Sequence, residues 1–148
     1  MRATKRLLIV SPWIRANVVN QTFIKQLTAC LDRGVQVTIG YGISRNDRSE
    51  REPDRIARES LEALTKAFGN FQLIRKGNTH AKILLVDDSY FVTTSFNWLS
   101  FSGDPNQPMR EEEGTLVEHK TAVDDYYRSQ LAKLLPQPAA SPRENARS

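Results

Sequence analysis

The stretch from Thr79 to Trp98 constrains the fold of this 148-residue chain more than any other part of the sequence. Residues 83–86 are a short run of leucine and β-branched residues, which predicts a buried strand. The polar residues at 87–89 predict a turn, and residues 90–94 predict a strand that returns beside the first. We therefore expect a β-hairpin here, around which the other elements are arranged.

Two pairs of polar residues flank this hairpin, each with a spacing of two. His80 and Lys82 precede its first strand, and Ser95 and Asn97 follow its second. In extended chain a spacing of two places both side chains on one face, and the hairpin brings the two pairs near each other. An imidazole, an ammonium, a hydroxyl and an amide in one place suit a phosphate diester, because they supply a nucleophile or base and donors for the non-bridging oxygens.

The spacing of these residues also matches a known family. A lone histidine beside a strand is usually structural, but here five polar positions agree with the pattern His-x-Lys-x4-Asp followed by Gly-Ser-x-Asn: His80, Lys82, Asp87, Ser95 and Asn97. The chain thus resembles the phospholipase D superfamily, the HKD phosphodiesterases. Thr94 is the one departure, since the family usually has glycine there.

The resemblance implies a mechanism. His80 attacks phosphorus and forms a phosphohistidine, while Lys82, Ser95 and Asn97 hold the phosphate oxygens. A second histidine, from a second copy of the motif, protonates the leaving oxygen. The mechanism requires no metal and no cofactor.

This chain contains one copy of the motif. Its other histidine, His119, has no lysine at spacing two, and we expect it to be an exposed loop residue. Two chains should therefore meet as a homodimer with a shared site, as single-motif members of the family do. We expect Trp98, Leu99 and Phe101 near that interface.

Two carboxylates are candidate catalytic partners of the histidine. Asp87 belongs to the motif, but it lies near the turn, which also fits a structural role. The family has a glutamate at the start of a later strand, and the run Glu112-Glu113-Gly114 followed by apolar residues fits that position. This comparison selects Glu112 as the partner of the histidine. Glu113 is the alternative if the register is shifted, and a solvated acidic loop without a catalytic role is the other alternative.

Strands and helices alternate over the rest of the chain, which predicts an α/β fold with a mixed, mostly parallel β-sheet flanked by helices on both faces. The expected strands are 7–14, 35–40, 71–75, the two hairpin strands and 111–117. The expected helices begin at an N-cap at Asn17, at 57 and at 121, where Thr121 and Asp124 resemble a capping box. A charged loop is expected at 44–55, and a loop rich in Gly, Pro, Asp and Asn at 99–110. Residues 1–135 should form a single domain, followed by a disordered tail at 136–148.

Composition narrows the location and the partners. The net charge is +4, and residues 1–75 carry 13 Lys and Arg against 7 Asp and Glu. This excess indicates a polyanionic substrate, although a solvated surface explains it equally well. There is no run of 18 apolar residues and no signal-peptide core. The single Cys30, on the apolar face of a helix, excludes an internal disulfide and fits a reducing, cytoplasmic compartment.

We therefore expect a metal-independent phosphodiesterase, a hydrolase that acts as a nuclease on DNA or RNA. The alternatives are a phospholipid hydrolase or phosphatidyl transferase that uses the same chemistry, and a non-catalytic nucleic-acid-binding module of a larger protein. The lipid alternative is disfavoured because no membrane anchor is visible in the sequence.

Overall fold

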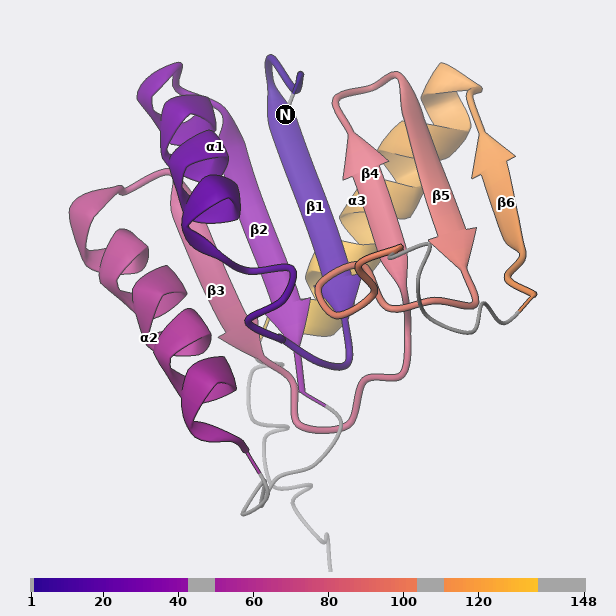
Figure 1. Cartoon of the computed structure of the whole chain (residues 1–148). Helices are drawn as coiled ribbons and strands as arrows, with labels where there is room; N and C mark the ends of the chain where they lie inside the picture. Colours follow the sequence, from indigo (N-terminus) through magenta and orange to yellow (C-terminus); the bar gives the residue numbers. More distant parts are fainter. Residues whose placement is uncertain (1, 43–49, 104–110, 136–148) are drawn as a thin grey trace, which may run out of the picture.

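The computed structural model describes residues 2–42, 50–103 and 111–135. Six strands in this part of the chain form one sheet in the order β3-β2-β1-β4-β5-β6 (Figure 1). The β1–β2 and β2–β3 pairs are parallel, whereas the β1–β4, β4–β5 and β5–β6 pairs are antiparallel. The strands are β1 (Arg6–Ser11), β2 (Gln36–Tyr41), β3 (Phe71–Arg75), β4 (Ile83–Val86), β5 (Tyr90–Thr94) and β6 (Gly114–Val117).

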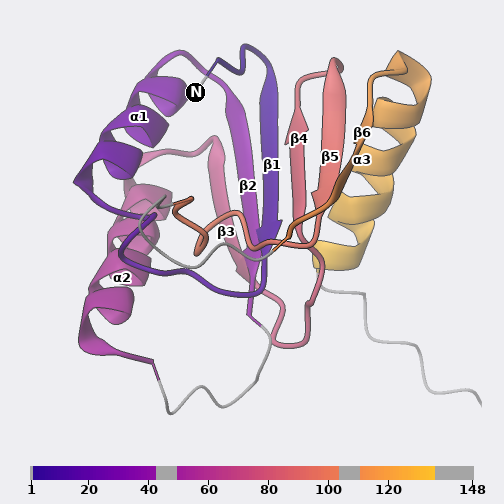
Figure 2. The ribbon, with the colours of Figure 1, turned by 45° about the vertical axis from the view of Figure 1, so that its right-hand side comes forward.

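Three helices cover the two faces of the sheet within the described residues. α1 (Gln21–Asp32) and α2 (Glu52–Ala67) lie on one face, and α3 (Lys120–Leu134) lies on the other (Figure 2). The predicted α/β fold, with a mixed sheet and helices on both faces, is therefore confirmed. Two of the five strand pairs in the described residues are parallel, both in the β3-β2-β1 half, and three are antiparallel, so the sheet is mixed but not mostly parallel as expected. The expected hairpin is the antiparallel β4–β5 pair.

Strand β1 lies in the middle of the sheet and is buried on both sides. Leu7 and Ile9 face the core beneath α1 and α2, whereas Leu8 and Val10 face the core beneath α3. Burying each such side chain stabilises the fold by about 1.5–3 kcal/mol. Because the apolar run is continuous, the sequence alone predicts a buried strand here.

The first helix begins later than the sequence indicates. The side chain of Asn20, not that of Asn17, accepts the capping hydrogen bond from the backbone amide of Phe23 at 3.1 Å. Residues before it form a turn instead, in which the amide of Val19 donates to the carbonyl of Arg15 at 2.8 Å. Asn17 as the N-cap was therefore wrong, because this turn takes up the backbone that the helix would have used.

The second helix begins earlier than expected, so the predicted loop does not extend to Arg55. Asp54 in its first turn is buried, and its carboxylate accepts hydrogen bonds from Arg15, Arg51 and the amide of Ala16. These contacts fix the start of α2 to the segment that follows β1. Residues 44–49 of the predicted loop lie outside the described residues.

The third helix has the expected extent but not the expected cap. His119 occupies the N-cap position without a side-chain hydrogen bond. Asp124 does not complete a capping box with Thr121, because its carboxylate bonds Arg6 at the start of β1 and Lys120 in its own helix. The predicted capping box was therefore wrong.

Three further predictions concern the burial of Cys30, the second loop and the C-terminal tail. Cys30 is buried in the core, as expected, and burial raises the pKa of its thiol. Residues 104–110 of the second predicted loop and the predicted tail at 136–148 lie outside the described residues. No helix in the described part of the chain is long and apolar enough to cross a membrane.

Candidate active site

Most of the predicted site residues lie at one edge of the sheet. Strands β1, β2 and β5 end at this edge, and β4 and β6, which run in the opposite direction, begin there. His80 and Lys82 precede β4, Ser95 and Asn97 follow β5, and Glu112 precedes β6. Loops at the ends of strands are the usual place for a site in α/β folds, because a rigid sheet positions them.

His80 and Lys82 contact each other directly. The ammonium nitrogen of Lys82 donates to the backbone carbonyl of His80 at 3.0 Å and lies 3.4 Å from the imidazole Nδ1. The backbone carbonyl of Lys82 accepts a hydrogen bond from the amide of Thr94 at 3.1 Å, which ties this pair to the end of β5. His80 is exposed and Lys82 is partly exposed, so an anion that arrives at this edge can reach both side chains.

Ser95 and Glu112 form a second pair. The Ser95 hydroxyl donates to the carboxylate of Glu112 and accepts from the backbone amide of Glu113 at 2.9 Å. The Ser95 amide also donates to the Glu113 carbonyl at 2.9 Å, because β5 and β6 pair in this register. The prediction that Glu112 orients His80 does not match this arrangement, since the nearest donor to its carboxylate is Ser95.

No described carboxylate is hydrogen-bonded to the imidazole of His80. The alternative partner, Glu113, contributes its backbone to the β5–β6 pairing, and its side chain is exposed. A hollow of about 290 Å³ opens beside Ser95 and Glu113. The Ser95 pair and the His80 pair thus lie on neighbouring strands at the same edge, and no hydrogen bond joins their side chains in the described structure.

Asn97 lies in a turn that is anchored to the end of β1. Its carbonyl accepts hydrogen bonds from the amides of Ser100 and Phe101, and the amide of Leu99 donates to the Ser11 hydroxyl at 3.2 Å. The Asn97 Oδ1 atom is buried and has no hydrogen-bond partner among the described residues. Its buried oxygen leaves the amide nitrogen as the atom available to a ligand.

A second buried polar atom without a partner in the described structure is the indole nitrogen of Trp98. Buried polar groups without partners are costly and rare, and two in adjacent residues single out this turn. Trp98 and Phe101 both contact Phe96, with ring centroids 4.7 and 5.1 Å apart. Phe101 is 42% exposed, whereas Leu99 is 1% exposed, so of these two residues Phe101 presents its side chain at the surface.

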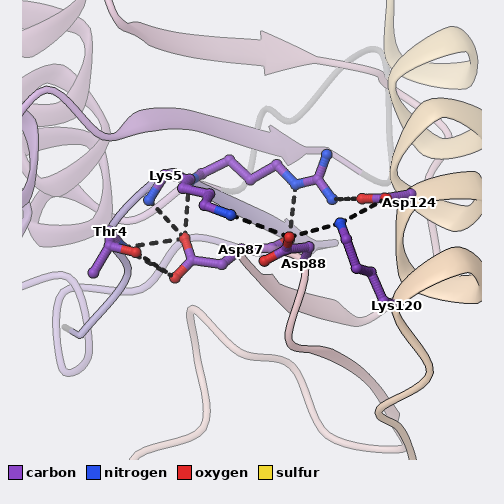
Figure 3. Close-up of polar contacts among 7 residues, drawn as sticks. Thr4, Lys5, Asp87, Asp88, Lys120 and Asp124 are labelled. Atoms are coloured by element: carbon purple, nitrogen blue, oxygen red, sulfur yellow. Dashed lines mark hydrogen bonds and ion pairs between the residues drawn. The ribbon is translucent and has the colours of Figure 1, made fainter.

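Asp87 has a different environment from the other motif residues. Its carboxylate accepts hydrogen bonds from the backbone amides of Thr4, Lys5 and Arg6 and from the Thr4 hydroxyl, at 2.7–3.1 Å (Figure 3). Burial raises the pKa of Asp87, but these hydrogen bonds outweigh burial and hold the pKa below its usual value.

Asp87 is also distant from the histidine. It follows β4, whereas Lys82 precedes it, and five residues of extended chain separate the two by about 16 Å. This separation and the hydrogen bonds to the start of β1 favour the structural role of Asp87 over the catalytic one. It is a structural residue that joins the β4–β5 turn to the start of β1.

Charged residues around Asp87 reinforce this end of the sheet. Asp88 in the same turn pairs with Lys5 and Lys120, and Lys120 also pairs with Asp124 (Figure 3). Hydrogen bonds from Lys120 and Lys5 hold the pKa of Asp88 well below its usual range. This network lies at the edge of the sheet opposite the candidate active site.

Residues on α3 adjoin His80 and were not expected at the site. Gln130 and Lys133 line a cavity that also reaches His80. Apolar residues at 123, 127, 131 and 134 of α3 would place Leu131 toward the sheet, but Gln130 is the buried residue there. A polar residue at helical spacing between Val123 and Leu134 was the signal that could have identified it.

Two further observations concern metals and His119. The described residues contain no cluster of three or more histidine, cysteine or acidic residues that could hold a metal ion. His119 is exposed at the start of α3, well separated along the chain from the His80 segment.

Comparison with known proteins shows which family has this arrangement. Residues 1–132 match the family described as "Cardiolipin synthase, PLD-like domain". No curated protein sequence matches the chain.

Three solved structures show the same fold. Nuc from Salmonella typhimurium, a phospholipase D family member, is 15% identical with a TM-score of 0.58, over 89% of this chain and 79% of that one. TrmBL2, an archaeal chromatin protein, is 12% identical with a TM-score of 0.56, over 88% and 43%. Phosphatidylserine synthase from Haemophilus influenzae is 19% identical with a TM-score of 0.53, over 88% and 32%. These structures share the fold, and because the family model matches residues 1–132, the chain belongs to the phospholipase D-like family.

Proposed function

We propose that this protein is a metal-independent phosphodiesterase that cleaves DNA or RNA through a phosphohistidine at His80. The observation that carries the proposal is the contact between His80 and Lys82 at the start of β4, within a phospholipase D-like domain. This pair supplies a nucleophile and an adjacent cation, which a phosphodiester substrate requires.

Substrate binding would rearrange the pair. For attack through Nε2, the imidazole must keep its proton on Nδ1, the atom near which the Lys82 ammonium lies at 3.4 Å. A bound phosphate is a stronger partner for the ammonium than the imidazole is, so Lys82 would turn to the phosphate oxygens. The Asn97 amide nitrogen and the Ser95 hydroxyl would bind further oxygens, and Ser95 would then release Glu112.

The proposed reaction consists of two displacements at phosphorus. A nitrogen of His80 forms a bond to phosphorus as the bond from phosphorus to the leaving oxygen breaks, and that oxygen takes a proton from a second histidine. Water then loses a proton to the second histidine and attacks phosphorus, which breaks the phosphorus–nitrogen bond. Since the chain has one motif, we infer that the second histidine is His80 of another copy, and sedimentation should show a homodimer at micromolar concentration.

Nucleic acid is favoured over lipid by charge. The net charge of +4 is concentrated in residues 1–75, and an extended polyanion benefits from such an excess more than a single headgroup does. The lipid alternative is supported by the description of the family and by the likeness in fold to a phosphatidylserine synthase. The likeness in fold to TrmBL2, an archaeal chromatin protein with a novel mode of DNA binding, supports binding to DNA without cleavage.

One experiment separates these functions. Fluorescently labelled DNA, labelled RNA and a fluorescent phospholipid in vesicles are each incubated with the protein in excess EDTA. We expect cleavage of a nucleic acid by the wild type, none by His80→Ala, and normal cleavage by the control His119→Ala. Turnover of the phospholipid alone would support the lipid alternative, and binding of DNA without turnover of any substrate would support the binding module.

A further inference from the structure

A cleft of about 540 Å³ lies beside His80, between the β3–β4 connection and the C-terminal half of α3. Its walls come from residues 76–81 on one side and from Tyr126, Gln130 and Lys133 on the other. Val10, Ile83 and Leu134 are buried residues that form its apolar floor. The volume is in the range of small-molecule sites in proteins, about 300–1,000 Å³.

Gln130 is the unusual residue in this cleft. It is 7% exposed, and its side-chain amide has no hydrogen bond to any described residue. Neither amide atom is among the fully buried polar atoms of the described residues that lack a partner, so the amide is open to the cleft and can exchange water for a ligand. Because Gln130 lines the cleft, a ligand there can provide both a donor and an acceptor for its amide.

The charges around the cleft have one sign. Lys76 and Lys133 both line it, and no described aspartate or glutamate does. The ammonium of Lys76 donates to the backbone carbonyl of Lys133 at the end of α3, whereas the side chain of Lys133 is exposed and makes no hydrogen bond or ion pair with the described residues. The cleft therefore favours a ligand with an anionic group near Lys133.

We propose that this cleft binds the nucleoside and the next phosphate of the substrate, adjoining the scissile phosphate at His80. The amide of Gln130 pairs with the edge of the base, the apolar floor lies beneath the base, and Lys133 pairs with the phosphate. The proposal rests on the function proposed above, because His80 on the rim of the cleft places the ligand beside the reacting phosphorus.

A nucleotide fits these features better than a phospholipid does. An amide with one donor group and one acceptor matches a base edge, which presents both kinds of atom. A cationic headgroup would require an acidic residue, which the cleft lacks among its described lining. Acyl chains would leave the amide of Gln130 unsatisfied and buried.

The test measures binding to the full chain without turnover. The probe is thymidine 3′,5′-bisphosphate, titrated by calorimetry into the wild type and into Gln130→Leu, Lys133→Ala and the controls Gln26→Leu and Lys25→Ala. The controls change exposed residues of the same types on α1, across the sheet. We expect Gln130→Leu and Lys133→Ala each to weaken binding about tenfold, the scale of losing about 1.4 kcal/mol, and the controls to bind like the wild type.

The outcomes distinguish the cleft from the catalytic proposal. Equal affinity in Gln130→Leu and the wild type, with the same melting temperature, would overturn the nucleotide site. Equal binding of glycerol 3-phosphate and the bisphosphate would also overturn it and would indicate recognition of phosphate alone. Binding that depends on Gln130 in a protein that cleaves no diester would support the cleft while refuting the proposed function.

Discussion

Replacing Asp87 tests whether this motif residue acts in folding or in catalysis. Its carboxylate accepts from three backbone amides and the Thr4 hydroxyl, and the residue is 7% exposed. A hydrogen bond to a charged group contributes about 1.5–3 kcal/mol. Because Thr4 and Lys5 are exposed, their amides can turn to water after a substitution, and only the amide of the half-buried Arg6 loses a partner in full.

We therefore expect Asp87→Ala to lower the free energy of unfolding by about 3–5 kcal/mol, a value that includes the left-handed backbone at this position (φ 55°). Asp87→Asn should cost only about 1–2 kcal/mol, because asparagine keeps an acceptor and tolerates that backbone. Urea unfolding, followed by the fluorescence of Trp13 and Trp98, measures both values. Asp88→Asn is the matched control in the same turn, and it should change stability little because its ion pairs are exposed.

The pH dependence adds a second check with a definite sign. The pKa of Asp87 is lowered in the folded protein, so its stabilising contribution is complete above the unfolded pKa of about 3.9 and is lost as the pH falls through the folded pKa. The difference in stability between the wild type and Asp87→Asn should therefore shrink below about pH 4. Loss of phosphodiesterase turnover in a fully folded Asp87→Asn protein, without loss of stability, would refute the structural role.

Two further predictions concern the phosphate site and the packing of α3. Lys82→Ala and Asn97→Ala should each lower turnover about a hundredfold or more, as expected for the loss of one transition-state donor, and normal kinetics in both would show that these residues are structural. Gly40→Ala should destabilise the fold by about 1–3 kcal/mol, because its Cβ would clash with a methyl group of the buried Leu134. Gly69→Ala is the control, since nothing lies within 4 Å of its Cβ. Equal melting temperatures for the two variants would contradict the close packing of α3.

The hairpin and the central strand could be predicted because their signals are local. Leu7 to Val10 and Ile83 to Val86 are apolar on both faces, and the β4–β5 turn needs no information from the rest of the chain. The contact between His80 and Lys82 likewise follows from two residues of spacing. Such features depend on short-range geometry, which a sequence displays directly.

The features that were missed depend on long-range packing. Glu112 bonds Ser95 because of the β5–β6 register, which no residue pattern specifies. The position of Asp87 becomes clear only when β1 lies beside β4 and offers three amides. The apolar residues of α3 do not predict the burial of Gln130, because a polar residue occupies part of the helical face that packs on the sheet.

The most direct test of the account is detection of the phosphohistidine itself. The protein is mixed with bis(p-nitrophenyl) phosphate in EDTA, quenched in alkali within one turnover, and digested for mass spectrometry, because a phosphorus–nitrogen bond survives base better than acid. We predict a nitrophenyl-phosphate adduct on the peptide that contains His80, reaching at most one adduct per two chains if the site is shared. Turnover without any adduct, or with an adduct on His119, would contradict the account.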